Sequence, residues 1–319
     1  MTRTVIFIPT GNPSIVNIEG TRQILSWVNS YCRSKGRGAI FDIQLMRPVL
    51  GEVHDFYSQA KPIGKGENPD LVIIPAVHGP WEQVRSQNQE LISWIRKVYS
   101  EGAQLVCYCI GAFLLAESGV LDGKRCSTHW DASNEFRGLF PNVELQDEKM
   151  IVEDRNIFSC GGAYGFTNLL VYLIERFVDY ETAVMAAKTF MIDLSRNNQS
   201  FYSVFNGLKS HGDQKVLKVQ EYLESNYDKK ISLADLSRLV HLTERTLQRR
   251  FKKHTHYTPI QYLQHIRIEV TKRLLTDKEK TVDQVMWDVG YEDSHHFRSV
   301  FRSITGKNPN AYRNGFAIS

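Results

Sequence analysis

Hydrophobic residues in the first two thirds of the chain form short uninterrupted runs, and segments with helical spacing separate these runs. Such runs are apolar on both faces, which is typical of strands covered by helices on each side. The predicted strands are residues 5–8, 39–45, 71–74, 104–108, 125–128 and 157–160. The predicted helices are residues 18–31, 87–99, 111–118 and 164–177. Alternating strands and helices predict an α/β domain of the flavodoxin-like type, with a parallel sheet flanked by helices.

Beyond residue 210 the hydrophobic spacing is helical throughout, and one pattern occurs twice. Residues 232–242 align with 281–291 at an offset of 49, and residues 247–262 align with 297–312 at an offset of 50. Each copy has a capping Ser or Thr, a first helix, a tight turn and a second helix with apolar residues four apart. This pattern predicts an all-α domain with two helix-turn-helix units.

The second helix of each copy has an apolar inner face and a polar or basic outer face. Arg side chains pair with guanine and Gln side chains with adenine, and each such contact contributes about 1–3 kcal/mol of discrimination. A solvated helix surface would explain one such face, but two copies in phase favour double-stranded DNA as the partner. The predicted DNA-binding residues are Arg245, Gln248, Arg249, Lys252, Ser294, His295, Arg298 and Arg302. Arg250 and Lys253, beside this face, are expected to contact phosphates.

A long amphipathic helix is predicted between the two copies, over residues 260–275. A stiff connector fixes the separation of the two second helices, so that they can enter major-groove segments about 34 Å apart. One chain would then bind a bipartite site.

The formal net charge of +4 is an average over two unlike parts of the chain. Residues 1–210 hold 20 basic and 22 acidic side chains, whereas residues 211–319 hold 19 basic and 13 acidic ones. The positive excess in the last third supports a nucleic-acid partner. A polar stretch with two glycines separates the parts, so we expect domains at 1–205 and 215–319 joined by a linker at 206–214.

The 319-residue composition, 42% hydrophobic and 23% charged, argues against a disordered or fibrous protein. The chain has five cysteines and neither C-x-x-C spacing nor a zinc pattern, so we expect no disulfide framework, no metal and no cofactor. The apolar run near the N-terminus ends at Pro9 and is too short for a signal-peptide core, and no run is long enough to span a membrane. We expect a cytoplasmic protein.

Cys109 lies where a predicted strand runs directly into a predicted helix, with Gly111 two positions later. This arrangement is typical of a nucleophile elbow. A helix N-terminus favours the thiolate and should lower the pKa of the Cys109 thiol. Backbone donors from Ile110 and from the loop at Gly79 predict an anion or oxyanion pocket, and His129 is the candidate basic partner.

Trp81 and Trp130 follow predicted strand ends, where open α/β sheets bind ligands. Aromatic side chains there can enclose a cationic amine, although both tryptophans could equally pack into the core. The predicted ligand-binding residues are Gly79, Trp81, Cys109, Ile110, His129 and Trp130.

The last hundred residues resemble the DNA-binding domain of the AraC/XylS family over about residues 215–316. The segments that carry the resemblance are 231–236, 246–253, 262–267, 288–291, 296–302 and 306–313, which ends in Gly-x-x-Pro-x-x-Tyr-Arg. One departure is His256, where the family usually has a glycine after the first recognition helix. The resemblance implies a transcriptional regulator, expected to be an activator that contacts RNA polymerase.

The first part resembles the class I glutamine amidotransferase-like superfamily, in its ThiJ/PfpI branch, over about residues 3–190. The segments 109–116, 121–125, 128–130 and 160–162 resemble the version of this domain that is fused to AraC-type domains. The superfamily's elbow cysteine maps onto Cys109, its histidine onto His129, and its acidic residue loosely onto Glu19. The protease branch has a histidine directly after the cysteine, and this chain has Ile110.

The resemblance implies a sensor domain without turnover, in which Cys109, His129 and Glu19 are vestiges of a catalytic site. It also implies a homodimer formed through the N-terminal domain and a small zwitterionic effector, a nitrogenous or carboxylate metabolite. Two alternatives remain open for Cys109. It could be the nucleophile of a cysteine-dependent amidase or glyoxalase-like enzyme, or a redox-sensing thiol.

Overall fold

The computed structural model describes residues 2–49, 57–64, 68–194, 198–202, 204, 205, 207, 209, 211–277 and 279–315. The chain divides into two compact units, Met1–Gln199 and Ser200–Ser319. The described residues of the predicted linker at 206–214 fall in the second unit.

A seven-stranded sheet is the centre of the first unit, with the strand order β10-β11-β7-β5-β1-β3-β4. Neighbouring strands are parallel, except that β10 runs antiparallel to β11. The strands are β1 (Thr2–Phe7), β3 (Phe41–Arg47), β4 (Lys61–Pro62), β5 (Leu71–Ile74), β7 (Gln104–Tyr108), β10 (Ile151–Asp154) and β11 (Ile157–Cys160).

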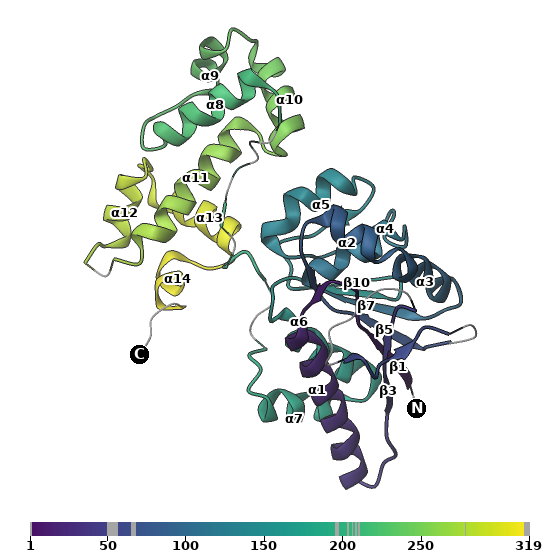
Figure 1. Cartoon of the computed structure of the whole chain (residues 1–319). Helices are drawn as coiled ribbons and strands as arrows, with labels where there is room; N and C mark the ends of the chain where they lie inside the picture. The colour runs from purple at the N-terminus through teal and green to yellow at the C-terminus, as the bar shows by residue number, and fades with distance from the viewer. Residues whose placement is uncertain are drawn as a thin grey trace. The chain divides into compact units, whose positions relative to one another are not determined.

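Helices cover both faces of this sheet (Figure 1). One layer consists of α1 (Ile15–Ser34), α6 (Gly165–Phe177) and α7 (Tyr180–Thr189). The other consists of α2 (Trp81–Gln87), α3 (Gln89–Ser100), α4 (Ala112–Glu117) and α5 (Ser133–Leu139). Alternate residues of the central strands enter different cores; in β5, Val72 and Ile74 pack under α2–α5, while Leu71 and Ile73 pack under α1, α6 and α7. The prediction of a doubly covered parallel sheet is confirmed.

Two predicted elements differ from the structure. The helix expected at 87–99 is α3, which begins at Gln89, and the preceding helix α2 was not predicted. Between the two helices, the buried side chain of Asn88 accepts from Thr10 N (2.9 Å) and donates to Thr10 O (3.1 Å) and Val84 O (2.8 Å). These bonds tie the helix break to the loop after β1. The strand expected at 125–128 is a short one, β8 (Arg125–Cys126), which pairs with β9 (Glu144–Leu145) outside the main sheet.

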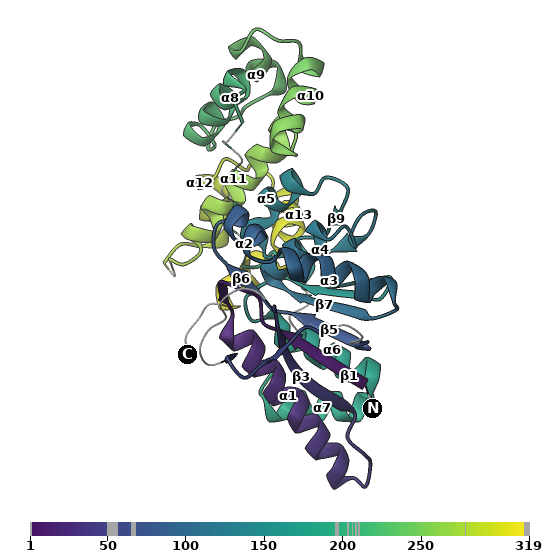
Figure 2. The same ribbon diagram turned by 45° about the vertical axis from the view of Figure 1, so that its right-hand side comes forward.

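The second unit is helical, and α11 joins two groups of helices (Figure 1; turned by 45° in Figure 2). Tyr262 and Leu263 of α11 enter the core of the first group, and Ile268 and Val270 enter the core of the second. The helices are α8 (Gln214–Ser225), α9 (Leu233–Leu239), α10 (Glu244–Thr255), α11 (Pro259–Leu274), α12 (Val282–Asp288), α13 (Ser294–Thr305) and α14 (Pro309–Gly315). Across the described part of the chain, no helix has both the length and the hydrophobicity needed to span a bilayer.

Candidate nucleic-acid interface and cysteine elbow

The two helix-turn-helix copies begin their helices in the same way. The first helices, α9 and α12, have seven residues each and start at capping boxes formed by Ser232 and Thr281. The second helices, α10 and α13, have 12 residues each, and the side chains of Thr243 and Asp293 cap their first turns. Equal lengths and equivalent caps give the two recognition helices the same local geometry.

The recognition helices also end in the same way. Thr255 and Thr305 are buried, and each hydroxyl donates over 2.8 Å to the carbonyl four residues earlier, at Phe251 or Phe301. The next residue is left-handed in both copies, His256 with φ of 64° and Gly306 with φ of 75°. His256 therefore adopts a backbone conformation that glycine adopts without steric cost.

The predicted DNA-binding residues lie on the outer faces of the two recognition helices. Seven of the eight are exposed, and Ser294 is half-buried at the start of α13. Arg298 is held by its neighbours, because its Nε donates to Ser294 Oγ (3.1 Å) and its Nη2 donates to Asp283 of α12 (3.3 Å). The copies thus present two exposed faces with guanidinium groups suited to base edges.

Arg250, which is expected to contact phosphates, makes an ion pair within the second unit. Its Nε donates to the carboxylate of Asp213, the residue that caps α8, and the Asp213 side chain is only 5% exposed. The ion pair draws Arg250 toward the interior of the unit, whereas the neighbouring Arg249 is exposed. Arg250 therefore fixes the position of α10 against α8.

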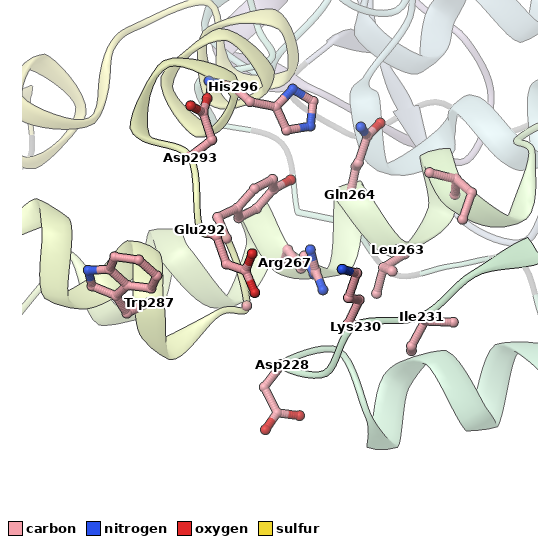
Figure 3. Close-up of a pocket in the computed structure, with 13 residues that line it drawn as sticks. Asp228, Lys230, Ile231, Leu263, Gln264, Arg267, Trp287, Glu292, Asp293 and His296 are labelled. Atoms are coloured by element: carbon pink, nitrogen blue, oxygen red, sulfur yellow. Dashed lines mark hydrogen bonds between the residues drawn. The ribbon is translucent and has the colours of Figure 1, made fainter.

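A pocket of about 490 Å³ lies where α11 meets both copies (Figure 3). Arg267 of α11 enters it and donates to Tyr227 O (2.7 Å) and Lys229 O (2.8 Å), in the segment before α9. Its guanidinium also lies 5.0 Å from the ring centre of Tyr291, in the turn before α13. One side chain of the connector thus contacts both copies and limits their rotation about α11.

The first unit contains the predicted elbow. Cys109 directly follows β7, has a positive φ of 54° and is 4% exposed. The turn continues through Cys109–Gly111 into α4, and a Cβ at Gly111 would lie 2.7 Å from the carbonyl oxygen of Pro75. The strained backbone and the obligatory glycine confirm the strand–elbow–helix geometry.

The expectation of a lowered Cys109 pKa is wrong. Burial raises the pKa of the thiol to about 11, although the hydrogen bond from the Ile110 amide acts in the opposite direction. Loss of hydration outweighs the helix N-terminus because the thiolate would be enclosed by the core. At neutral pH the Cys109 side chain is a thiol.

The segment containing His129 lies beside the elbow, since Thr128 Oγ1 donates to Cys109 O (2.9 Å). The Nδ1 of His129 accepts from the Asp131 amide (3.2 Å), and burial lowers the pKa of the imidazole. The ring of Trp130 lies 5.1 Å from that of His129. The structure therefore gathers three predicted ligand-binding residues at the carboxyl end of β7.

The remaining predicted residues of this site have other surroundings. Trp81 opens α2 rather than lying in a loop, and its ring packs 5.4 Å from Phe113 and 6.0 Å from Phe140. Glu19 pairs with Arg22 over 2.8 Å and also faces Tyr57. Gly79, with φ of 141°, follows the short strand β6 (Val77–His78).

Comparisons with known proteins agree with this division. The profile of the DJ-1/PfpI family matches residues 55–176, and that of a helix-turn-helix domain matches residues 236–315. The HTH-type transcriptional regulator GbdR of Pseudomonas aeruginosa is 26% identical over 258 residues, which are 81% of this chain and 70% of that protein. The regulator CdhR of the same species is 26% identical over 254 residues, 79% of this chain and 74% of that protein.

The last part of the chain also matches proteins that share less of its length. The HTH-type transcriptional activator RhaS of an Enterobacter species is 29% identical over 113 residues, 35% of this chain and 40% of that protein. The chain combines a DJ-1/PfpI domain with an AraC-type DNA-binding domain. It is a DNA-binding transcriptional regulator.

Two buried side chains of the first unit were not predicted from the sequence. Asn17, 2% exposed, accepts from Ala76 N (3.2 Å) and so ties α1 to the loop after β5. Gln199, 1% exposed, donates to Thr128 O (2.8 Å) and accepts from Trp130 N (3.2 Å). Neither stands in a recognisable motif, and Gln199 is about 70 positions from its partners, so no local pattern indicates its role.

Proposed function

We propose that this regulator binds a bipartite DNA site and places α10 and α13 in two successive major-groove segments of the same duplex. The observation that supports this most directly is the pair of equally capped 12-residue helices with exposed polar faces. The contacts of Arg267 with both copies restrain their relative orientation, so one bound copy would position the other. The residues proposed to read bases are Arg245, Gln248, Arg249, Lys252, Ser294, His295, Arg298 and Arg302.

We propose further that the DJ-1/PfpI domain binds a small nitrogenous or carboxylate metabolite at the elbow and does not turn it over. The Ile110 amide at the start of the helical turn suits an anionic group, and His129 and Trp130 lie beside it. The raised pKa of Cys109 argues against a standing thiolate nucleophile. Trp81 is a weaker candidate for this pocket because its ring packs on Phe113 and Phe140.

We also propose that the chain is an activator, that it contacts RNA polymerase, and that it dimerises through its N-terminal domain in the cytoplasm, where its DNA target lies. One relative is named a transcriptional activator, which supports the sign of regulation. A cysteine-dependent amidase, a glyoxalase-like enzyme or a redox sensor is the alternative role of the first unit. Turnover that disappears in Cys109→Ala, with DNA binding retained, would favour the enzyme.

Selection of duplexes from a random library by the full chain tests the DNA-binding proposal. Arg249→Ala or Arg298→Ala should weaken binding to the selected duplex by about 1–3 kcal/mol at fixed salt and relax its base preference. Lys188→Ala, which removes an exposed cation from α7 in the first unit, is the matched control and should leave binding unchanged. Equal affinities of all four chains would overturn the assignment of the reading faces.

Calorimetry of the full chain with a panel of amino acids and betaines tests the effector proposal. Saturable heat that is lost in Trp130→Ala and retained in Trp81→Ala is the expected result. Absence of saturable heat with every compound of the panel would remove zwitterionic metabolites from consideration.

A further inference from the structure

Gln199 is the last residue of the first unit, and its side chain forms hydrogen bonds with the segment beside the elbow. Gln199 Nε2 donates to Thr128 O over 2.8 Å and lies 3.3 Å from Ser127 Oγ, while its Oε1 accepts from the Trp130 amide. Gln199 fills the space beside Gly161, since a Cβ there would lie 2.1 Å from Nε2. Gln199 therefore fixes the backbone on both sides of His129.

Phe201, the second residue of the second unit, is an aromatic residue buried in the core of that unit. Phe201 is 4% exposed, its ring lies 4.7 Å from that of Tyr312 in α14, and Lys307 Nζ lies 4.3 Å from its ring centre. Phe201 belongs to the core that also contains Phe301 of α13. This anchor thus packs in the second helix-turn-helix copy.

A second anchor follows in the first copy. The ring of Phe205 lies 5.0 Å from that of Tyr262 and stacks 4.9 Å from His265, both in α11. The Phe205 amide donates to Glu269 Oε2 over 3.1 Å. Phe201 and Phe205 together bring this short segment into contact with the cores of both copies.

Only Ser200 separates Gln199 from Phe201 along the sequence. Two residues of extended chain reach roughly 7 Å, so the segment between these anchors holds little slack. A ligand that displaces the loop of Thr128 and Trp130 changes the hydrogen bonds of Gln199. This change occurs two positions from Phe201, so the packing of Phe201 around α13 is the nearest place in the second unit where it can have an effect.

We propose that Gln199 is a positioning residue of the effector site and that Gln199, Ser200 and Phe201 couple this site to the helix-turn-helix copies. This inference rests on the proposed DNA-binding and effector functions. Coupling between two sites is reciprocal. If the effector changes the affinity for DNA, then DNA bound at α10 and α13 must change the affinity of the elbow site for the effector by the same factor. The inference can therefore be tested with DNA alone.

The test uses hydrogen–deuterium exchange of the full chain with and without a duplex selected as described above. In the natural chain, the duplex should change exchange in the peptide containing the Trp130 amide by about five-fold or more. A chain with Gly-Ser inserted between Ser200 and Phe201 keeps both anchors and lengthens the connection. It should bind the duplex with unchanged affinity, and the duplex should no longer alter exchange at Trp130.

Two control chains separate coupling from a loss of structure. The same insertion after Gly38, an exposed position with nothing near its missing Cβ, should leave the response of the Trp130 peptide intact. Gln199→Met keeps the length of the side chain and removes its hydrogen bonds, so it should also abolish the response of the Trp130 peptide. This variant provides the test if the insertion chain is unstable.

The possible outcomes are distinct. Retention of the exchange response in both the insertion chain and Gln199→Met overturns the coupling. A selected duplex that leaves the Trp130 peptide of the natural chain unchanged overturns the coupling and spares the proposed function. Failure to select any duplex overturns the proposed function itself, and the coupling with it.

Discussion

Asp213 accepts a hydrogen bond from Nε of Arg250, and this ion pair joins the N-cap of α8 to the recognition helix α10. The same carboxylate accepts from the amides of Lys215 (3.1 Å) and Val216 (3.2 Å), and His254 Nε2 lies 3.4 Å away. Burial of a carboxylate is tolerated here because its oxygens are satisfied from several sides. One side chain of the recognition helix thus contributes to stability, although the neighbouring Arg249 faces solvent.

Arg250→Ala should lower the free energy of unfolding by about 2 kcal/mol. A partner removed from a buried ion pair costs about 3–5 kcal/mol, and we expect less because the Arg250 side chain is itself 42% exposed. Arg249→Ala, one position away and exposed, should leave stability within about 0.5 kcal/mol and weaken duplex binding instead. Urea unfolding measures the stability of both variants, and duplex titration measures their affinity for DNA. Unchanged stability of Arg250→Ala with weakened binding would return Arg250 to a phosphate-contacting role.

The same carboxylate should make stability depend on acidic pH. Burial alone would raise the pKa of Asp213, but the Arg250 hydrogen bond, the Val216 amide and the nearby charges together lower it. A lowered pKa stabilises the folded state above the unfolded value of about 3.9, and this stabilisation is lost as pH falls through the folded value. Asp213→Asn should therefore be less stable than the natural chain at pH 7, and the difference should shrink below about pH 4. A constant difference across this range would contradict the assignment.

The turns of the two copies make a matched prediction about backbone strain. His241 and Gly290 occupy equivalent positions and have φ of 52° and 80°. His241→Gly should be neutral to stabilising by about 0.5 kcal/mol, because relief of the left-handed strain is partly offset by the entropy of glycine in the unfolded chain. Gly290→Ala should destabilise by about 3 kcal/mol, since its Cβ would lie 2.3 Å from Asp228 O, a backbone atom. Thermal unfolding of both variants provides the comparison, and equal effects of the two substitutions would contradict this difference in backbone strain and contact.

The hydrophobic pattern predicts the main strands and the repeated helices because their signals are local. The run at 71–74 is buried on both faces, and Ser232 and Thr281 begin helices as capping residues should. The break at Asn88 could not be predicted in this way, since it depends on hydrogen bonds to Thr10, 78 positions away. The antiparallel strand β10 was also missed, because its four residues, Ile-Val-Glu-Asp, have only two apolar positions and no hydrophobic run.

In the candidate sites, too, the features set by local sequence were predicted and those set by distant residues were not. The outer faces of α10 and α13 follow from helical periodicity, so their exposure matches the prediction. Charge type alone does not separate Arg249 from Arg250, because the difference lies in Asp213, 37 positions before Arg250. The elbow geometry at Cys109 follows from a strand, a turn and a glycine, whereas the protonation state of its thiol follows from burial that only the packed structure shows.

Alkylation of Cys109 should show the consequence of that burial directly. The thiolate is the reactive form, and a pKa raised from 9.0 to about 11 leaves roughly one hundredth of the ordinary thiolate at neutral pH. Iodoacetamide labelling of the folded chain, followed by mass spectrometry of the peptide containing Cys109, should rise about ten-fold per pH unit from pH 7 to pH 10 without levelling off.

The unfolded chain in urea is the control for this profile, and its labelling should level off near the ordinary thiol pKa. The raised pKa of the Cys109 thiol also makes stability depend on pH. It stabilises the folded state below pH 9, and this contribution is lost as pH rises toward 11. Cys109→Ser should therefore reduce the loss of stability between pH 9 and pH 10. Labelling of the folded chain that levels off at or below pH 7 would instead identify a thiolate, and would favour the enzymatic or redox alternatives over a silent effector site.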